Sequence, residues 1–124
     1  IMAYDAYCPA EAIEAAGVKA AASQAELFEQ CDIVSLHIPA TAETKQSINY
    51  ELVGKMKKGG ILINSARKEV VDEAGLLKLM EERADLKYLT DIMPDADAEF
   101  AKFEGRYFAR RWVRRPPKQT ATRA

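Results

Sequence analysis

Apolar positions along this chain are spaced in two ways. Short runs such as Ile61–Asn64 are typical of buried strands, whereas Leu76, Leu79 and Met80 recur at the spacing of one helix face. This pattern predicts strands over residues 1–5, 18–21, 32–38, 61–64 and 86–90. It predicts helices over residues 9–16, 24–30, 49–57 and 72–83. Short strands that alternate with helices imply an α/β fold with a parallel sheet.

Residues next to the predicted helices support these assignments. Ser23 precedes the second helix and Glu26 lies three positions further on, which is the spacing of a capping box. Gly17 follows the first helix, and the pair Gly59-Gly60 follows the third. Because glycine is common just after the last turn of a helix, we take these glycines as helix ends.

The sequence contains no glycine-rich loop of the kind that holds a dinucleotide pyrophosphate after the first strand of a doubly wound fold. It also begins with Ile1 and not with an initiator methionine, which fits a fragment. We therefore expect residues 1–108 to form the distal part of a doubly wound, Rossmann-like dinucleotide-binding domain. Its first strand and Gly-rich loop are missing from the chain.

Composition limits the class of protein. The chain has 124 residues, of which 48% are hydrophobic, so it can build the core of one domain. No apolar run approaches the roughly 20 residues of a membrane span, and a soluble, cytoplasmic protein with no membrane partner is expected. The two cysteines and the single histidine predict neither a disulfide framework nor a metal site.

Charge is distributed unevenly. Residues 106–124 hold seven of the 18 basic residues and no acidic residue, although the net charge of the chain is −1. A basic tail on an acidic domain would ordinarily suggest a nucleic acid or an anionic membrane surface as partner.

Arg67 is the strongest candidate for chemistry. It follows the apolar run Ile61–Asn64 and precedes a predicted helix, and ligands of open α/β sheets bind at such strand ends. A guanidinium there can hold a carboxylate with two parallel hydrogen bonds. The alternative is an ordinary surface arginine that pairs with Glu69 or Asp72.

A series of ordered blocks surrounds Arg67. In chain order they are residues 31–39, Thr41, Thr44, Ile48, Asn49, Leu52, Met56-Lys57, Gly59-Gly60 and residues 60–73. The series resembles the D-2-hydroxyacid dehydrogenase family, from about Tyr4 to Phe108. Several blocks at fitting spacings are more specific than one short motif.

The resemblance implies an NAD-dependent oxidation of a small 2-hydroxy acid. Arg67 would bind the substrate carboxylate and polarise the 2-oxo group, and Asp91 would hydrogen-bond the nicotinamide carboxamide. Asp5 would accept hydrogen bonds from the adenosine ribose and so favour NAD over NADP; its alternative role is that of a turn residue before a helix. The other implied cofactor-binding residues are His37, Pro39, Thr44, Asn64 and Ala66. His37 is not expected to be the catalytic base.

The chain departs from the family at two places. Ala96 stands where many relatives have a glutamate that supports the catalytic histidine, although Asp95 or Asp97 would offer a carboxylate nearby. Residues 109–124 match nothing in the family and include no proton-transfer histidine. One hypothesis is a reading frame shifted by one base after Phe108. The rival is a native, basic, disordered arm with Trp112 available for stacking on a nucleic acid, which we do not favour.

These features predict a fragment of a dehydrogenase that is inactive as this chain alone. Within the family, Tyr4-Asp5, residues 36–39 and residues 91–94 favour members that oxidise 3-phosphoglycerate to 3-phosphohydroxypyruvate in serine biosynthesis. The alternative is a non-catalytic module of the same fold that binds NAD or another protein. The resemblance also implies a homo-oligomer in the full-length protein. A phosphate-receiving regulatory domain is a weaker possibility.

Overall fold

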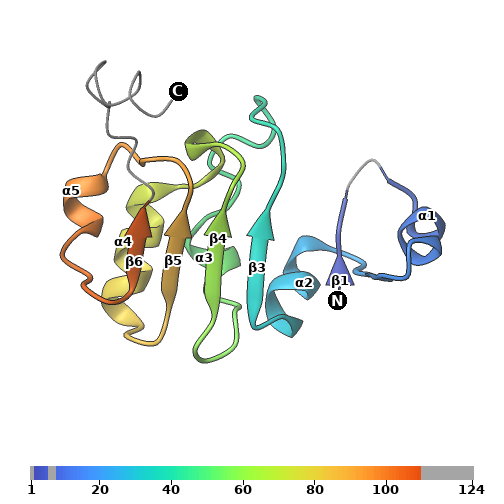
Figure 1. Ribbon diagram of the computed structural model, residues 1–124, viewed down its shortest axis with the longest axis horizontal. Helices are drawn as coiled ribbons and strands as arrows, with labels where there is room; N and C mark the ends of the chain where they lie inside the picture. The colour runs from blue at the N-terminus through green and yellow to red at the C-terminus, as the bar shows by residue number, and fades with distance from the viewer. Residues whose placement is uncertain (1, 6–7, 110–124) are drawn as a thin grey trace, which may run out of the picture.

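The computed structural model describes residues 2–5 and 8–109, and the strands it describes are all parallel (Figure 1). β1 (Met2–Ala3) pairs with β2 (Lys19–Ala20) in a small sheet. A second sheet has the order β3 (Ile33–Leu36), β4 (Ile61–Asn64), β5 (Lys87–Thr90) and β6 (Tyr107–Ala109). The helices are α1 (Ala10–Ala15), α2 (Gln24–Gln30), α3 (Tyr50–Val53), α4 (Glu73–Glu82) and α5 (Asp97–Phe100), with a 3₁₀ turn η1 (Lys68–Val70). This arrangement confirms the predicted α/β, Rossmann-like class.

Each predicted element is present: α2 and β4 have the predicted bounds, and the others are shorter. Ser23 Oγ accepts a hydrogen bond from the Glu26 amide at 3.1 Å, which confirms the predicted cap of α2. The third helix was predicted over residues 49–57, but α3 ends at Val53 because the amides of Lys55 and Met56 bond to carbonyls only three residues back. The turn after it has Gly59 at φ 81°.

The apolar pattern did not indicate α5 or β6. Ala109 was predicted to begin the tail, but it is the last residue of β6 and pairs with Thr90. The remainder of that tail, including Trp112, lies outside the described residues. The prediction about residues 110–124 therefore stays a prediction.

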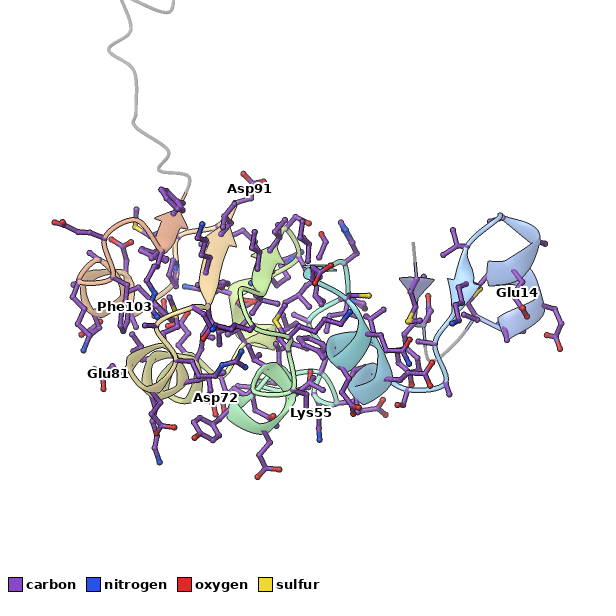
Figure 2. The ribbon with its side chains drawn as sticks, turned by 90° about the horizontal axis from the view of Figure 1, so that it is seen from below. Glu14, Lys55, Asp72, Glu81, Asp91 and Phe103 are labelled. Carbon is purple, nitrogen blue, oxygen red and sulfur yellow. The ribbon has the colours of Figure 1, made fainter. Side chains whose placement is uncertain are left out.

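The core lies on one face of the four-stranded sheet. The strand register places Val34, Leu62, Tyr88 and Tyr107 in one row, and all four side chains are buried. The helices α2, α3, α4 and α5 lie on that side of the sheet (Figure 2). The Tyr88 ring packs against Phe100 and Tyr107 at ring-centroid distances of 5.4 and 6.0 Å, which joins α5 and β6 to the core.

The opposite face and one edge of this sheet are open. The next register row consists of Ser35, Ile63, Leu89 and Phe108, and Phe108 is 53% exposed. β3 pairs with β4 on one side, and within the described ranges no strand pairs with its other side.

No helix in the described part of the chain is long and apolar enough to cross a membrane.

Two arginines hold the amino-terminal edge of the sheet to the helices. Arg83 Nη1 donates to the carbonyls of Gly54 and Met56, at 3.1 and 3.0 Å. Arg106 donates to the carbonyls of Met80, Arg83 and Leu86, at 2.6, 2.7 and 3.1 Å. The last carbonyls of a helix have no partner within the helix, so these guanidinium groups satisfy acceptors that would otherwise need water.

Candidate functional site

The carboxyl ends of the four parallel strands form one line. The register pairs Leu36 with Asn64, Asn64 with Thr90 and Thr90 with Ala109. Residues that directly follow these strands therefore lie along one edge of the sheet, as ligand-binding residues of open α/β sheets do. Among the predicted site residues, His37, Ala66, Arg67 and Asp91 follow β3, β4 or β5 closely.

Arg67 is exposed at this edge. Its backbone is extended, with φ −143° and ψ 148°, and it directly precedes η1. Within the described residues, no ion pair joins its guanidinium to a carboxylate. Asp72, one of the two partners proposed in the alternative reading, instead accepts from the Gly75 amide at 3.3 Å and caps α4. The arrangement leaves the guanidinium available to an external carboxylate.

Asn64 differs from the prediction in what it contacts. Its side chain is fully buried. Its Oδ1 accepts from the Ala66 amide at 3.0 Å, and its Nδ2 donates to the Arg67 carbonyl at 3.0 Å and to the Tyr88 hydroxyl at 3.4 Å. The amide of Asn64 is therefore occupied by the chain itself, and it shapes the turn that carries Arg67.

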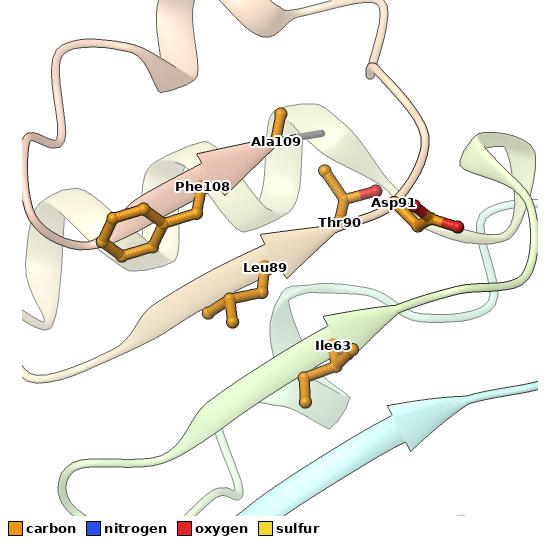
Figure 3. Close-up of a pocket in the computed structure, with 6 residues that line it drawn as sticks. All are labelled: Ile63, Leu89, Thr90, Asp91, Phe108 and Ala109. Atoms are coloured by element: carbon orange, nitrogen blue, oxygen red, sulfur yellow. The ribbon is translucent and has the colours of Figure 1, made fainter. Parts of the chain in front are cut away.

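Asp91 follows β5 and is exposed. Its amide donates to the Asn64 carbonyl at 3.0 Å, which ties the end of β5 to the end of β4. Its side chain lies on the side of the sheet away from Asp72 and Glu81 (Figure 2). It also borders a shallow, mainly apolar depression on the open face, lined by Ile63, Leu89, Thr90, Asp91, Phe108 and Ala109 (Figure 3).

His37 is held by two serines that the sequence analysis did not single out. Ser35 Oγ lies 2.8 Å from Nε2, and Ser65 Oγ lies 3.3 Å from Nδ1 and donates to the Leu36 carbonyl at 3.1 Å. Because the Ser65 proton is used on that carbonyl, Ser65 can only accept from Nδ1, whereas the hydroxyl of Ser35 can donate to or accept from Nε2. Ser35 could have been found, since alternate strand residues share a face, whereas Ser65 depends on the strand register.

The other predicted cofactor residues are not gathered around Arg67. Thr44 Oγ1 donates to the Pro39 carbonyl at 2.6 Å and accepts from the Thr41 amide at 2.7 Å, so its hydroxyl organises its own loop. Asp5 is exposed just after β1, in the separate two-stranded sheet.

The acidic residues near Ala96 have partners within the chain. Asp95 pairs with Lys68 Nζ at 2.6 Å, and this hydrogen bond raises the pKa of Lys68. Asp97 accepts from the Tyr107 hydroxyl at 2.7 Å. Glu73 accepts from the amides of Asp95 and Ala96, at 3.2 and 2.9 Å. Both carboxylates that were considered as substitutes for the family's glutamate therefore support the loop after β5.

Burial raises the pKa of Tyr88, while hydrogen bonds with Asn64 and Thr90 act in the opposite direction. The folded protein thus favours the neutral phenol, and its stability should fall as pH rises above the pKa of an unfolded tyrosine, about 10. We expect the free energy of unfolding to decline less steeply above this pH in Tyr88→Phe than in the unchanged chain. Urea titrations at a series of alkaline pH values would show this, and parallel curves would contradict it.

The side chains at the strand ends include hydrogen-bond acceptors that suit the two ends of a dinucleotide. Carboxylates follow β1 and β5, at Asp5 and Asp91, where ribose hydroxyls and a carboxamide could donate to them. No glycine-rich turn for the pyrophosphate occurs in the sequence. The described residues contain no group of three or more side chains placed to hold a metal ion.

Comparison with known proteins gives a consistent result. Residues 1–106 match the family model described as "D-isomer specific 2-hydroxyacid dehydrogenase, NAD binding domain". D-3-phosphoglycerate dehydrogenase of Methanocaldococcus jannaschii is 37% identical over 82 residues, which are 66% of this chain and 16% of that protein. (S)-sulfolactate dehydrogenase of Chromohalobacter salexigens is 39% identical over 109 residues, which are 85% of this chain and 35% of that protein.

A solved structure shows the same relationship. NAD⁺-bound 3-phosphoglycerate dehydrogenase of Entamoeba histolytica superposes with a TM-score of 0.70 and 42% identity, over 80% of this chain and 37% of that one. The chain therefore spans well under half the length of each relative it matches.

Proposed function

The chain belongs to the D-isomer specific 2-hydroxyacid dehydrogenase family, whose NAD-binding domain it matches over residues 1–106 as a partial domain, and from this we propose that it is part of an NAD-dependent dehydrogenase of 2-hydroxy acids. The cofactor of this domain is NAD. When bound, NAD supplies the hydride acceptor. Side chains of the protein would bind and orient the cofactor and the substrate.

The observation that carries the proposal is the position of Arg67. It lies at the carboxyl end of β4, is exposed, and makes no ion pair among the described residues. A cation in such a place suits a carboxylate ligand, because two parallel hydrogen bonds fix both the position and the rotation of the carboxylate. Arg67 would hold the substrate carboxylate and polarise its 2-oxo group.

The cofactor would extend along the same edge. Asp91 would accept from the carboxamide of the nicotinamide ring, and Asp5 would accept from the adenosine ribose. His37, Pro39 and Thr44 would line the cleft between them, with Asn64 and Ala66 beside the ring. Because the Asn64 amide is buried and engaged, its contribution would pass through the backbone of residues 64–67.

For the substrate we propose 3-phosphoglycerate, oxidised to 3-phosphohydroxypyruvate in the cytoplasm as a step of serine biosynthesis. Two of the relatives named above are 3-phosphoglycerate dehydrogenases, and a third is a sulfolactate dehydrogenase. The full-length protein would be a homo-oligomer. As this chain alone it would be inactive, because it contains no glycine-rich loop and because, among the described residues at the edge that holds Arg67, none is assigned as proton carrier, His37 included.

The experiment is an equilibrium titration of the chain with NAD⁺ and NADP⁺ by calorimetry. We expect NAD⁺ to bind and NADP⁺ to bind more weakly by roughly tenfold or more, because the 2′-phosphate would face the Asp5 carboxylate. The variant Asp5→Asn should reduce the difference between the affinities for NAD⁺ and NADP⁺. Absence of NAD⁺ binding would overturn the proposal.

A spectrophotometric assay at 340 nm with 3-phosphoglycerate and NAD⁺ complements the titration. We expect no turnover by the 124-residue chain. Binding of NAD⁺ without any response to a 2-oxo carboxylate would favour the alternative, a non-catalytic module that binds NAD or another protein.

A further inference from the structure

Three buried polar side chains lie beneath the strand ends that carry Arg67 and Asp91. Asn64, Tyr88 and Thr90 are 0%, 1% and 4% exposed, and we call them the buried polar layer. Asn64 and Thr90 are the only non-aromatic polar residues among the buried positions of the described chain, and Tyr88 adds a buried hydroxyl. Burial of polar groups in a core costs free energy unless each group finds a partner, so their contacts identify what the layer holds in place.

Asn64 is the junction between the two ligand-facing segments. Its side chain bonds to the Ala66 amide and the Arg67 carbonyl, both at 3.0 Å. Its backbone carbonyl accepts from the Asp91 amide at 3.0 Å, and Thr90 Oγ1, whose single proton is closest to the Ile92 carbonyl at 2.7 Å, lies 3.3 Å from it. One residue therefore connects the turn after β4 with the turn after β5.

Thr90 and Tyr88 complete the layer from β5. Thr90 Oγ1 accepts from the Ile92 amide at 3.1 Å and lies 2.7 Å from the Ile92 carbonyl, so it shapes the turn on both sides of Asp91. The Tyr88 hydroxyl accepts from Asn64 Nδ2 at 3.4 Å. The Tyr88 ring in turn packs against Phe100 and Tyr107, which anchors the layer to the core.

We propose that Asn64, Tyr88 and Thr90 are positioning residues that fix Arg67 and Asp91 relative to each other. The inference rests on the proposed function, in which these two charged residues contact the substrate carboxylate and the nicotinamide carboxamide. Because all three side chains are buried, they would not contact a ligand themselves. They act by making the two turns move as one unit, which preorganises the edge for a carboxylate and a carboxamide bound side by side.

The first test needs no ligand. Hydrogen exchange followed by NMR reports the amides of Ala66 and Ile92, which bond to Asn64 Oδ1 and Thr90 Oγ1. Thr90→Val removes the hydroxyl and keeps the shape of the side chain. We expect exchange to accelerate roughly tenfold at Ile92, whose partner is lost, and also several-fold at Ala66 on the other turn.

Tyr88→Phe and Tyr107→Phe form a matched pair for the same measurement. Both remove one hydroxyl from the same aromatic cluster, but the Tyr107 hydroxyl bonds to Asp97 and not to the layer. Only Tyr88→Phe should accelerate exchange at Ala66. The proposal would be overturned if Tyr88→Phe and Tyr107→Phe accelerated exchange at Ala66 equally. It would also be overturned if Thr90→Val accelerated exchange at Ile92 and not at Ala66.

The second test measures binding of glyoxylate, a small 2-oxo carboxylate, to the chain saturated with NAD⁺. We expect Thr90→Val to weaken binding by roughly tenfold, and Thr90→Ser, which restores the hydroxyl, to stay within about twofold of the unchanged chain. Equal affinities in Thr90→Val and Thr90→Ser would count against the proposal. If the unchanged chain bound no glyoxylate, the proposed function would fail, and the exchange data would still decide whether the layer couples the two turns.

Discussion

Replacing Arg67 by glutamine is expected to weaken binding of a 2-oxo carboxylate to the NAD⁺-saturated chain by roughly tenfold to 100-fold. The estimate corresponds to the net loss of one hydrogen bond to a charged group, at about 1.5 to 3 kcal/mol. Because Arg67 is exposed and has no ion pair among the described residues, removing it leaves no carboxylate of the chain unpaired. The folded state should therefore be little affected.

Two further variants separate charge from geometry at this position. Arg67→Lys keeps the positive charge but loses the planar fork, so its affinity should lie between those of the unchanged chain and Arg67→Gln. Lys58→Gln removes an exposed cation from the loop at the opposite end of β4 and serves as the control. Isothermal titration with glyoxylate gives all four affinities. Equal weakening by Lys58→Gln would mean that net charge, and not the strand-end arginine, governs binding.

Replacing Arg106 by methionine is expected to lower the free energy of unfolding by about 2 to 4 kcal/mol. The guanidinium is half-buried and donates to three backbone carbonyls, those of Met80, Arg83 and Leu86. Methionine can fill much of the space of the aliphatic stem but offers no donor. The three acceptors would then have to find water at a site that is partly closed to it.

Lys102→Met is a matched control for this prediction. Lys102 Nζ lies 5.3 Å from the centre of the Phe103 ring and Arg106 Cζ lies 5.0 Å from it, so both variants lose a contact between a cation and the same aromatic ring. Lys102 otherwise pairs with Glu81 at the surface, and such pairs contribute about 0 to 1 kcal/mol. Urea unfolding monitored by circular dichroism measures both. A loss of similar size in the two variants would show that the carbonyl contacts of Arg106 contribute little.

The sequence predicted the larger helices and strands because their signals are local. The apolar spacing within residues 72–83 and the single run Ile61–Asn64 depend on residues a few positions apart, and α4 and β4 lie at those places. Ser23 was identified as a cap for the same reason. In contrast, α5 and β6 are short and carry aromatic residues whose periodicity is too brief to recognise.

The positions of the candidate site residues in the fold were predictable, whereas their contacts were less so; their roles stay predictions. A residue at the end of a buried strand is exposed to ligand whatever the rest of the fold does, so Arg67 and Asp91 could be proposed from sequence. Asn64 was expected beside the nicotinamide ring, but it is buried and bonded to the turn that follows it. Thr44 was expected to reach the cofactor cleft, and its hydroxyl is used within its own loop.

The sequence by itself determined the order of strands and helices from β1 to β5, the absence of a glycine-rich loop within the given residues, and the arginine at the end of β4. All of these follow from neighbours along the chain. Only the tertiary structure decided that Ser65 contacts His37, that Asn64 joins the ends of β4 and β5, and that Arg106 binds carbonyls 20 to 26 residues away. The reason is physical: hydrogen bonds between distant residues depend on strand register and helix packing, and these are set by burial of the whole core.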